Sequence, residues 1–283
     1  MQVARTIAET RVAIAAARRV GERVGLVPTM GALHEGHLSL VRRARGECDF
    51  VVLSIFVNPT QFAPGEDYAR YPRAEARDLA LAKAEGVDLV FAPSAEEMYP
   101  AGAATTVHVS GLTEVMCGPF RPGHFDGVTT VVAKLFAITM PDRAYFGEKD
   151  FQQLQVLRQM ARDLNLPVEV VGCSTVREPD GLALSSRNAY LSEEERRVAP
   201  ALHRALLAGA EAALRGGRAE DAEEAVRAAL ATEPRFQLQY VEARRPDTLQ
   251  RDDLPGPPFV IAAAAYLGAT RLIDNVVVER ESP

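Results

Sequence analysis

The stretch VGLVPTMGALHEGH, from Val24 to His37, decides the fold. Its first five residues form an apolar run typical of a buried strand, and the Thr-Met-Gly that follows is a turn. Residues 33–44 then repeat apolar side chains at helical spacing, which predicts a helix. A buried strand that feeds directly into a helix is the basic unit of a parallel α/β sheet.

Two histidines stand at the start of that predicted helix. His34 and His37 are three residues apart, so at about 100° per residue their side chains lie roughly 60° apart and can face one ligand. The helix N-terminus adds N–H groups and a partial positive charge, which favour a phosphate. In an open parallel sheet, ligands bind outside the carboxyl ends of the strands. The competing interpretation is two ordinary surface histidines at a helix start.

Strands and helices alternate through the first two thirds of the chain. This alternation predicts an α/β fold, with a Rossmann-like parallel sheet and helices on both faces. Strands are expected at residues 24–28, 50–57, 87–92, 144–146 and 168–173, and helices at 1–20, 33–44, 75–85, 126–139 and 150–164.

The pattern changes after Ser174. Ser192 and Glu195 have capping-box spacing, and one long helix is expected from there to about Arg215. A second helix from residue 219, strands at 237–243, 259–265 and 271–278, and a turn at 253–258 complete a smaller α+β unit. We therefore predict a catalytic domain over residues 1–174 and a smaller C-terminal domain over residues 175–283.

The composition excludes several classes of protein. The 283 residues carry 32 Lys and Arg against 38 Asp and Glu, a net charge of −6, and 47% are hydrophobic. The high apolar fraction excludes intrinsic disorder, and the acidic balance argues against a nucleic-acid binder. Cys48, Cys117 and Cys173 form no CxxC pair, so no disulfide framework is indicated. Residues 1–20 lack a signal-peptide pattern, and no apolar run reaches the ~18 residues that cross a bilayer. We expect a cytoplasmic protein that binds neither nucleic acid nor membrane.

Two other interpretations of the histidine segment fail on residue identity. Gly31 and Gly36 have P-loop spacing, but His37 and Leu38 stand where Lys and Ser or Thr are required. The run from His34 to His37 is one residue shorter than the zinc motif HExxH, and no third ligand is evident. We therefore assign no metal ligands.

Three further clusters carry polar groups suited to substrates. Residues 146–150 (FGEKD) stand where a strand turns into a helix, and would place Lys149 beside a phosphate. Residues 184–188 (LSSRN) offer two hydroxyls and a guanidinium on a loop, which could clamp a polyphosphate. Asn58 and Gln61 are uncharged donors and acceptors that suit a hydroxy acid. Each cluster alone is also compatible with an ordinary turn or loop.

Taken together, these segments resemble one known family. PTMGALHEGH (28–37), FVNPTQF (56–62), FGEKD (146–150) and LSSRN (184–188), in this order and spacing, resemble the motifs of the pantothenate synthetase, or pantoate–β-alanine ligase, family. Residues 121–127 (RPGHFDG) fit the same family. It belongs to the HIGH-motif nucleotidyltransferases, relatives of the class I aminoacyl-tRNA synthetases. The resemblance extends over residues 24–191, and the four-part string is far more specific than the histidine motif alone.

The resemblance implies an activity and a set of roles. The activity is condensation of pantoate with β-alanine to pantothenate, with ATP cleaved to AMP and diphosphate through a pantoyl adenylate. Catalytic roles fall to His34, His37, Lys149 and Arg187, with His37 as proton donor, and substrate contacts to Gln61 and Gln153. The ATP site implied by the family pattern consists of Met30, Gly31, Ala32, Leu33, His34, Glu35, Gly36, His37, Gly147, Glu148, Lys149, Asp150, Val176, Leu184, Ser185, Ser186 and Arg187.

The resemblance also implies partners for the chain and the nucleotide. Mg²⁺ is expected to accompany ATP, because it bridges phosphate oxygens and keeps several waters. Asp78 resembles an acidic position that helps to hold the ion, but Arg77 departs from the paired acids of the family, so no ligand is assigned. The family is usually homodimeric, and the domain that begins with the Ser-Ser-Arg-Asn loop is the expected lid over a reactive adenylate.

Two other functions remain to be weighed against the ligase. An adenylyltransferase acting on a phosphorylated acceptor would need extra Lys or Arg, whereas Gln61 and Gln153 suit a hydroxy acid. A nucleotide sensor without turnover would not need an acceptor pocket. ATP–diphosphate exchange with and without pantoate distinguishes the three.

Overall fold

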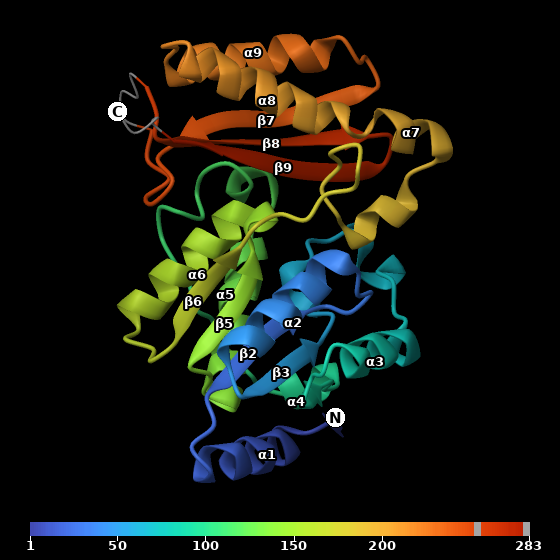
Figure 1. The fold of residues 1–283 in the computed structure, drawn as a ribbon, viewed down its shortest axis with the longest axis vertical. Coiled ribbons are helices and arrows are strands. Elements are labelled where there is room, and N and C mark those ends of the chain that lie inside the picture. Colours follow the sequence, from blue (N-terminus) through green and yellow to red (C-terminus); the bar gives the residue numbers. More distant parts are fainter. Residues whose placement is uncertain (252–255, 280–283) are drawn as a thin grey trace. The chain divides into compact units, whose positions relative to one another are not determined.

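The structure is a computed structural model that describes residues 1–251 and 256–279, drawn in Figure 1. Residues 253–255 of the predicted turn lie outside the described part of the chain. The chain divides into two compact units. Unit 1 comprises Met1–Ser110, Arg121–Glu148 and Val156–Ser174, and unit 2 comprises Gly111–Phe120, Lys149–Gln155 and the described part of Thr175–Pro283.

Unit 1 is built on a parallel sheet of six strands in the order β1-β4-β3-β2-β5-β6. All of its strand pairs are parallel, as the alternating pattern predicts. The strands are β1 (Gln2–Ala4), β2 (Val24–Thr29), β3 (Phe50–Ile55), β4 (Leu89–Phe91), β5 (Arg143–Gly147) and β6 (Glu169–Cys173).

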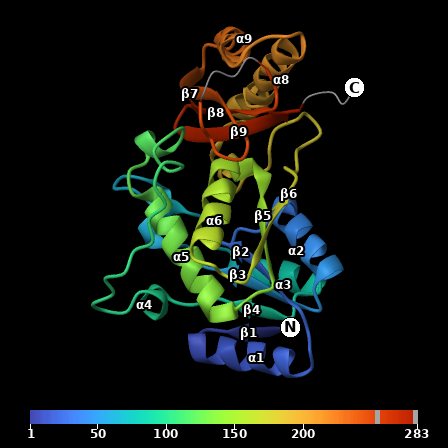
Figure 2. The same cartoon turned by 90° about the vertical axis from the view of Figure 1, so that its left-hand side faces the viewer.

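Helices cover both faces of this sheet, and Figure 2 shows α2 and α5 on opposite sides of it. Most apolar residues of β2 and β3 are completely buried, as expected of strands covered on both faces. The helices are α1 (Ile7–Arg19), α2 (Glu35–Glu47), α3 (Glu75–Ala84), α4 (Ala95–Met98), α5 (His124–Thr139) and α6 (Phe151–Asp163), whose first residues belong to unit 2. Short 3₁₀ helices in the two units are η1 (Pro59–Gln61), η2 (Asp67–Arg70), η3 (Gly118–Phe120), η4 (Glu148–Asp150) and η5 (Ser186–Tyr190).

The strand order reverses between β2 and β5. From β2 the sheet continues through β3 to β4 on one side, and through β5 to β6 on the other. Gly25 pairs with Arg143 and Leu26 with Ala144, so the two strands run side by side in the same direction. The carboxyl ends of parallel strands at such a reversal are where ligands bind in open α/β sheets.

Unit 2 contains an antiparallel sheet in the order β7-β8-β9. Alanine and branched side chains of β8 pack with α8 and α9 into an apolar core on one face of this sheet. The elements are α7 (Glu193–Val198), α8 (Ala201–Leu214), α9 (Ala219–Ala231), β7 (Phe236–Arg244), β8 (Phe259–Leu267) and β9 (Thr270–Val278).

Two helix predictions are wrong in part. Residues 1–20 do not form one helix, because Gln2–Ala4 pairs with β4 as strand β1 and α1 begins only after the capping box of Thr6 and Glu9. Pairing with a neighbouring strand overrides the local helical pattern at such a short segment.

The predicted helix from Ser192 to Arg215 is two helices, α7 and α8, separated at Ala199 and Pro200. Proline has no N–H to donate and its ring clashes with the preceding turn, so it ends one helix and begins the next. The capping box of Ser192 and Glu195 is confirmed.

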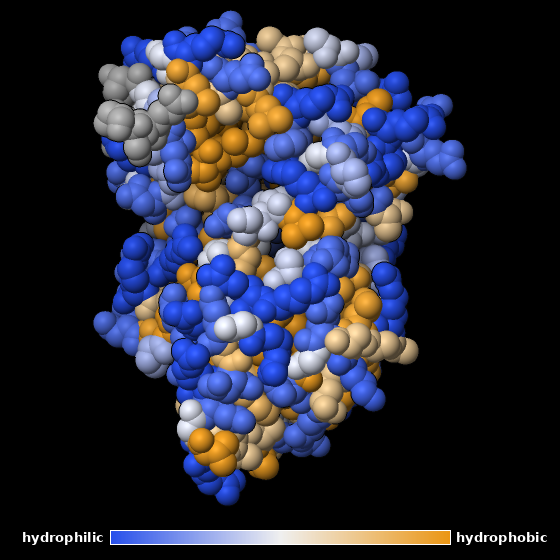
Figure 3. Space-filling view, in the orientation of Figure 1, coloured by the Kyte–Doolittle hydropathy of each residue, from blue (hydrophilic) through white to orange (hydrophobic). Residues whose placement is uncertain are grey.

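Among the described residues, no helix is long and apolar enough to cross a bilayer. Figure 3 shows hydrophilic side chains over most of the visible face, interrupted by smaller apolar areas.

Candidate active site

The segment that joins β2 to α2 is held by a buried carboxylate. Asp78 of α3 is 1% exposed, and its two oxygens accept hydrogen bonds from the backbone N–H groups of Ala32 and Leu33, both at 2.8 Å. Gly31 has φ +80° and Ala32 φ +52°, so the chain makes a left-handed bend here. A Cβ on Gly31 would lie 3.0 Å from Asp78 Oδ2, so glycine gives both the bend and the close approach.

His34 and His37 close the first turn of α2. The predicted helix therefore begins two residues later than expected, at Glu35, with His34 as its N-cap. His34 Nδ1 accepts a hydrogen bond from Gly36 N at 3.2 Å, and His37 Nδ1 accepts one from His34 N at 3.3 Å. The two rings lie close together, tilted by 36°, with their centroids 4.0 Å apart.

These hydrogen bonds determine where a neutral imidazole carries its proton. A nitrogen that accepts a hydrogen bond must keep its lone pair, so both Nδ1 atoms are unprotonated and each ring carries N–H at Nε2. The sequence predicts both histidines on one face, and the structure brings their rings together at the N-terminus of α2. This combination is suited to phosphate oxygens.

Gln61 lies beside the same segment. Its Nε2 donates to Met30 Sδ at 3.0 Å, and its Oε1 accepts from Asn58 Nδ2 at 3.1 Å. Asn58 is 1% exposed, and its other polar contacts include Gly127 O and the Tyr99 hydroxyl. The expectation that Asn58 is a substrate group is therefore corrected, since its amide joins η1, α5 and Tyr99 and positions Gln61.

Residues 121–127 also contact Gln61, through its backbone carbonyl. The Gln61 carbonyl accepts from Arg121 Nη2 at 3.3 Å and lies 2.8 Å from His124 Nδ1. Arg121 also forms a bidentate pair with Glu66, at 2.6 and 2.7 Å. Burial alone would raise the pKa of the Glu66 carboxyl, but the hydrogen bonds and charge of Arg121 outweigh burial and lower it. The pair therefore stays ionised at neutral pH and fixes the loop that carries Gln61.

The FGEKD segment spans the boundary between the units. Gly147 ends β5 in register with Cys173, and Glu148 is the last residue of unit 1 in this segment. Lys149 and Asp150 belong to unit 2. The Lys149 side chain is 18% exposed, and its Nζ lies 3.8 Å from Asp150 Oδ2.

The segment from Val176 to Arg187 is a short hairpin followed by a 3₁₀ turn. Leu184 N donates to Val176 O at 3.0 Å, so these two predicted ATP-site residues are direct neighbours. Ser185 caps η5, since its Oγ accepts from Arg187 N at 3.3 Å. Ser186 and Arg187 form the first turn of η5 and are partly buried.

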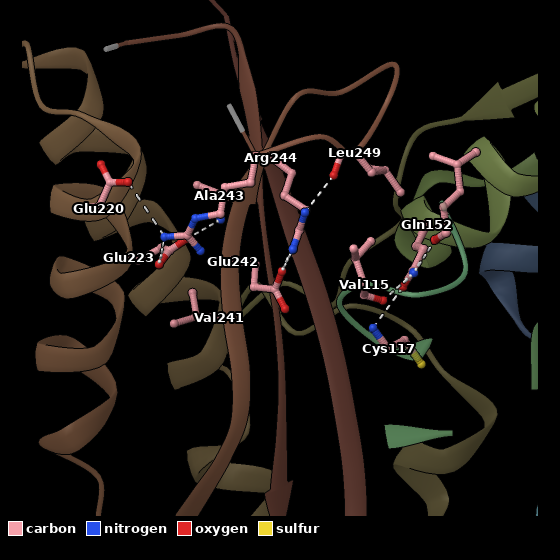
Figure 4. A network of polar contacts seen from close by, with 12 residues as sticks. Val115, Cys117, Gln152, Glu220, Glu223, Val241, Glu242, Ala243, Arg244 and Leu249 are labelled. Atoms are coloured by element: carbon pink, nitrogen blue, oxygen red, sulfur yellow. Dashed lines mark hydrogen bonds and ion pairs between the residues drawn. The ribbon is translucent and has the colours of Figure 1, made fainter. Parts of the chain in front are cut away.

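Gln153 follows a residue that anchors the start of α6. Figure 4 shows Gln152 directed at the segment that carries Val115 and Cys117. Its Oε1 accepts from Cys117 N at 3.0 Å, and its Nε2 donates to Leu112 O and Val115 O at 2.8 and 2.7 Å. The adjacent Gln153 is partly buried.

The structure thus collects the predicted residues in two groups. Residues 30–37, Gln61, Gly147 and Glu148 belong to unit 1, and Lys149, Asp150, Gln153, Val176 and residues 184–187 belong to unit 2. Sequence analysis named Asp78 and Asn58 in other roles, and it missed Asp274, whose carboxylate accepts hydrogen bonds from Arg177 at 2.6 and 2.9 Å. One signal could have found Asp274, because it is an acidic residue on the same face of β9 as buried Leu272 and Val278.

The described residues contain no cluster of three or more His, Cys, Asp or Glu side chains that could hold a metal ion. Both oxygens of Asp78, the residue that resembles a magnesium position, are engaged by backbone N–H groups.

Comparison with known proteins gives a consistent result. The family model described as pantoate-beta-alanine ligase matches residues 2–277. Pantothenate synthetase from Moorella thermoacetica is 56% identical over 99% of both chains. The crystal structure of pantothenate synthetase from Thermus thermophilus has a TM-score of 0.94 at 55% identity, covering 99% of this chain and 100% of that one.

A more distant structure carries ligands. Pantoate-beta-alanine ligase from Francisella tularensis, complexed with beta-gamma ATP and beta-alanine, has a TM-score of 0.81 at 34% identity and covers 98% of this chain and 97% of that one. The match of the family model to nearly the whole chain, and relatives above 50% identity over nearly their full length, show that this chain belongs to the pantoate–β-alanine ligase family.

Proposed function

We propose that this chain condenses pantoate with β-alanine to form pantothenate, with ATP cleaved to AMP and diphosphate through a pantoyl adenylate. Family membership across residues 2–277 supports the overall reaction. The observation that carries the proposal is the start of α2, where the rings of His34 and His37 lie 4.0 Å apart directly after a central parallel strand.

In the first step, a pantoate carboxylate oxygen attacks the α-phosphorus of ATP. A new O–P bond forms, the bond to the oxygen that bridges the α- and β-phosphates breaks, and diphosphate leaves with the electron pair. Negative charge builds on the oxygens of the α-phosphoryl group and of the leaving diphosphate, and needs positioned donors there. We assign this role to His34, His37, Lys149 and Arg187, with His37 as proton donor.

The other residues of these segments surround the nucleotide. Backbone amides of residues 30–37 suit phosphate oxygens because they lie at a helix N-terminus. Residues 147–150, Val176 and residues 184–187 complete the proposed ATP site.

Gln61 and Gln153 are assigned to pantoate, and Gln61 also borders the proposed β-alanine site. An amide can donate to a carboxylate and accept from a hydroxyl, which matches a hydroxy acid. The contact of Gln61 Nε2 with Met30 Sδ supports this role, since it places the amide beside the proposed nucleotide segment.

In the second step, the β-alanine amine attacks the acyl carbon and AMP leaves. The C–N bond forms, the C–O bond to AMP breaks, and the amine loses a proton. An acyl adenylate must be protected from water, so we assign residues 175–283 as a lid domain.

Mg²⁺ is proposed to enter with ATP. The ion prefers oxygen ligands and keeps several waters, and proteins commonly bind it through one or two carboxylates and the substrate phosphates. Because Asp78 is already engaged by two amides, we assign the ion to the phosphates and water. A cytoplasmic location, expected from the sequence, and a homodimer, implied by the resemblance, remain proposals.

Isotope exchange between ATP and diphosphate tests the function. We expect exchange that depends on pantoate, and pantothenate formation once β-alanine is added. Exchange that requires a phosphorylated acceptor, or no exchange with any acceptor, would overturn the proposal. Removal of Mg²⁺ by a chelator should abolish exchange, and its restoration should recover it.

A further inference from the structure

Asn275 of β9 holds the backbone of Lys149. Its side-chain Nδ2 donates to the Lys149 carbonyl oxygen at 3.0 Å, across 126 residues of sequence. Both residues belong to unit 2. The bond fixes the backbone of the residue whose ammonium is assigned to the nucleotide phosphates.

The preceding residue, Asp274, holds the hairpin that leads to Arg187. Its carboxylate accepts from both terminal nitrogens of Arg177, at 2.6 and 2.9 Å. Arg177 Nη1 also donates to Gly181 O at 3.1 Å, and Arg177 pairs with Ala183 across the hairpin. The guanidinium therefore joins β9 to both sides of the hairpin.

The surroundings of Asp274 keep it ionised. It is 4% exposed, and His203 Nδ1 lies 3.4 Å from its Oδ2. Burial would raise the pKa of this carboxyl, but contacts with His203 and Arg177 outweigh burial and lower it. Gly181, with φ +93°, would place a Cβ 3.1 Å from the His203 ring, so the hairpin turn lies close against α8.

A buried ion pair often adds little net stability over an apolar pair, because desolvation offsets the attraction. We therefore expect the Arg177–Asp274 pair to act mainly by fixing the position of the hairpin. Adjacent residues of a strand point to opposite faces, so Asp274 and Asn275 can hold segments on the two sides of one strand.

We propose that Asp274 and Asn275 are positioning residues that hold the Lys149 segment and the Arg187 loop at fixed positions relative to each other. Both cations can then bind the same ATP molecule. This inference rests on the proposed function. It predicts that Asn275 affects adenylation through Lys149.

A double-mutant cycle tests the first anchor, with pantoate-dependent ATP–diphosphate exchange as the measurement. Asn275→Ala should lower kcat/KM for ATP at least ~10-fold, because small misplacements of a catalytic group are costly. In the Lys149→Ala background the same substitution should change the residual rate by less than ~2-fold, as expected when one residue acts through the other. Val277→Ala, at an exposed position on the same strand, is the matched control and should leave both rates unchanged.

Equal losses from Asn275→Ala in the two backgrounds, or no loss in the parent, would overturn the inference. If the parent itself shows no pantoate-dependent exchange, the proposed function fails instead. Far-ultraviolet circular dichroism establishes that each variant is folded before rates are compared. Should Asn275→Ala fail to fold, Asn275→Leu, which removes the donor at similar size without adding a charge, replaces it in the cycle.

Hydrogen exchange tests the second anchor without reference to activity. Arg177→Lys keeps the positive charge but loses the bidentate hydrogen bonds to Asp274. Peptides over residues 176–187 should exchange at least ~5-fold faster, because local opening becomes easier. Arg215→Lys, in an exposed pair with Glu211, is the control and should leave these peptides unchanged. Unaltered exchange in Arg177→Lys would contradict the role of Asp274.

Discussion

The segment of residues 30–37 in unit 1 and that of residues 176–187 in unit 2 are both assigned to ATP, yet they are held by different means. The first continues a buried strand into a helix, and Asp78 binds two of its amides. The second is a short hairpin held by Arg177 and Asp274, 97 residues apart. The comparison shows that one half of the proposed site directly follows a buried strand and is held by hydrogen bonds from backbone amides, whereas the other depends on a long-range ion pair.

The largest expected effect concerns that ion pair. Asp274→Asn leaves the Arg177 guanidinium without its partner charge, and breaking a buried pair costs roughly 3–5 kcal/mol. Urea unfolding at pH 7 measures the loss. Glu211→Gln, in an exposed pair with Arg215, serves as the control and should cost less than about 1 kcal/mol. Equal losses of unfolding free energy in the two variants would show that the residue 176–187 segment does not depend on the buried ion pair.

The same pair predicts a pH dependence. Because the pKa of Asp274 is lowered in the folded chain, its contribution is fully present above the ordinary aspartate pKa of about 3.9 and is lost as the pH falls through the folded value. Arg177 and His203 are the charged or titratable groups that face it. The difference in unfolding free energy between the parent and Asp274→Asn should therefore shrink below about pH 4. Urea unfolding at a series of acidic pH values measures this difference. A difference that stays constant over the series would contradict the prediction.

Lys149→Ala tests the proposed cation of unit 2. Loss of one transition-state donor costs about 2.7–4 kcal/mol in comparable sites, so single-turnover adenylate formation should slow at least ~100-fold while the fold is retained. Lys83→Ala, at an exposed position on α3, provides the comparison. Near-normal adenylation in Lys149→Ala would defeat the role assigned to this residue.

The smallest effect is expected at the anchor of unit 1. Asp78→Asn keeps the size of the side chain but leaves one acceptor for two amides, so an unsatisfied N–H should cost about 1–3 kcal/mol. We expect slower adenylation as well, since the segment that carries His34 shifts. Thermal unfolding together with exchange rates would test this, with exposed Asp49→Asn as the control. An unchanged melting temperature would show that Asp78 is not the anchor.

Much of unit 1 could be predicted from sequence. Strands such as Phe50–Ile55 are almost entirely apolar, and the position of His34 and His37 where a strand meets a helix already indicates a phosphate site. These signals are local, so a single sequence carries them. The capping box at Ser192 was predictable for the same reason.

The supports of the site could not be predicted in the same way. Asp78, Asn58 and Asp274 meet partners that lie 41 to 97 positions away, and only the folded chain shows which partners these are. Strand β1 was not predicted because three residues are too few to show an alternating pattern, and the residues that follow them have helical periodicity. Long-range pairing, rather than residue type, decides these features.

The long separation between β9 and the segments it holds has a consequence during synthesis. Lys149 is made 126 residues before Asn275, and Arg177 is made 97 residues before Asp274. At ~5–20 residues per second, the ribosome needs roughly 6–25 s to cover the longer interval. Throughout that time the hairpin of residues 176–187 and the Lys149 segment lack their contacts with β9. The ability to use ATP should therefore arise late, only when β9 has emerged from the ribosome.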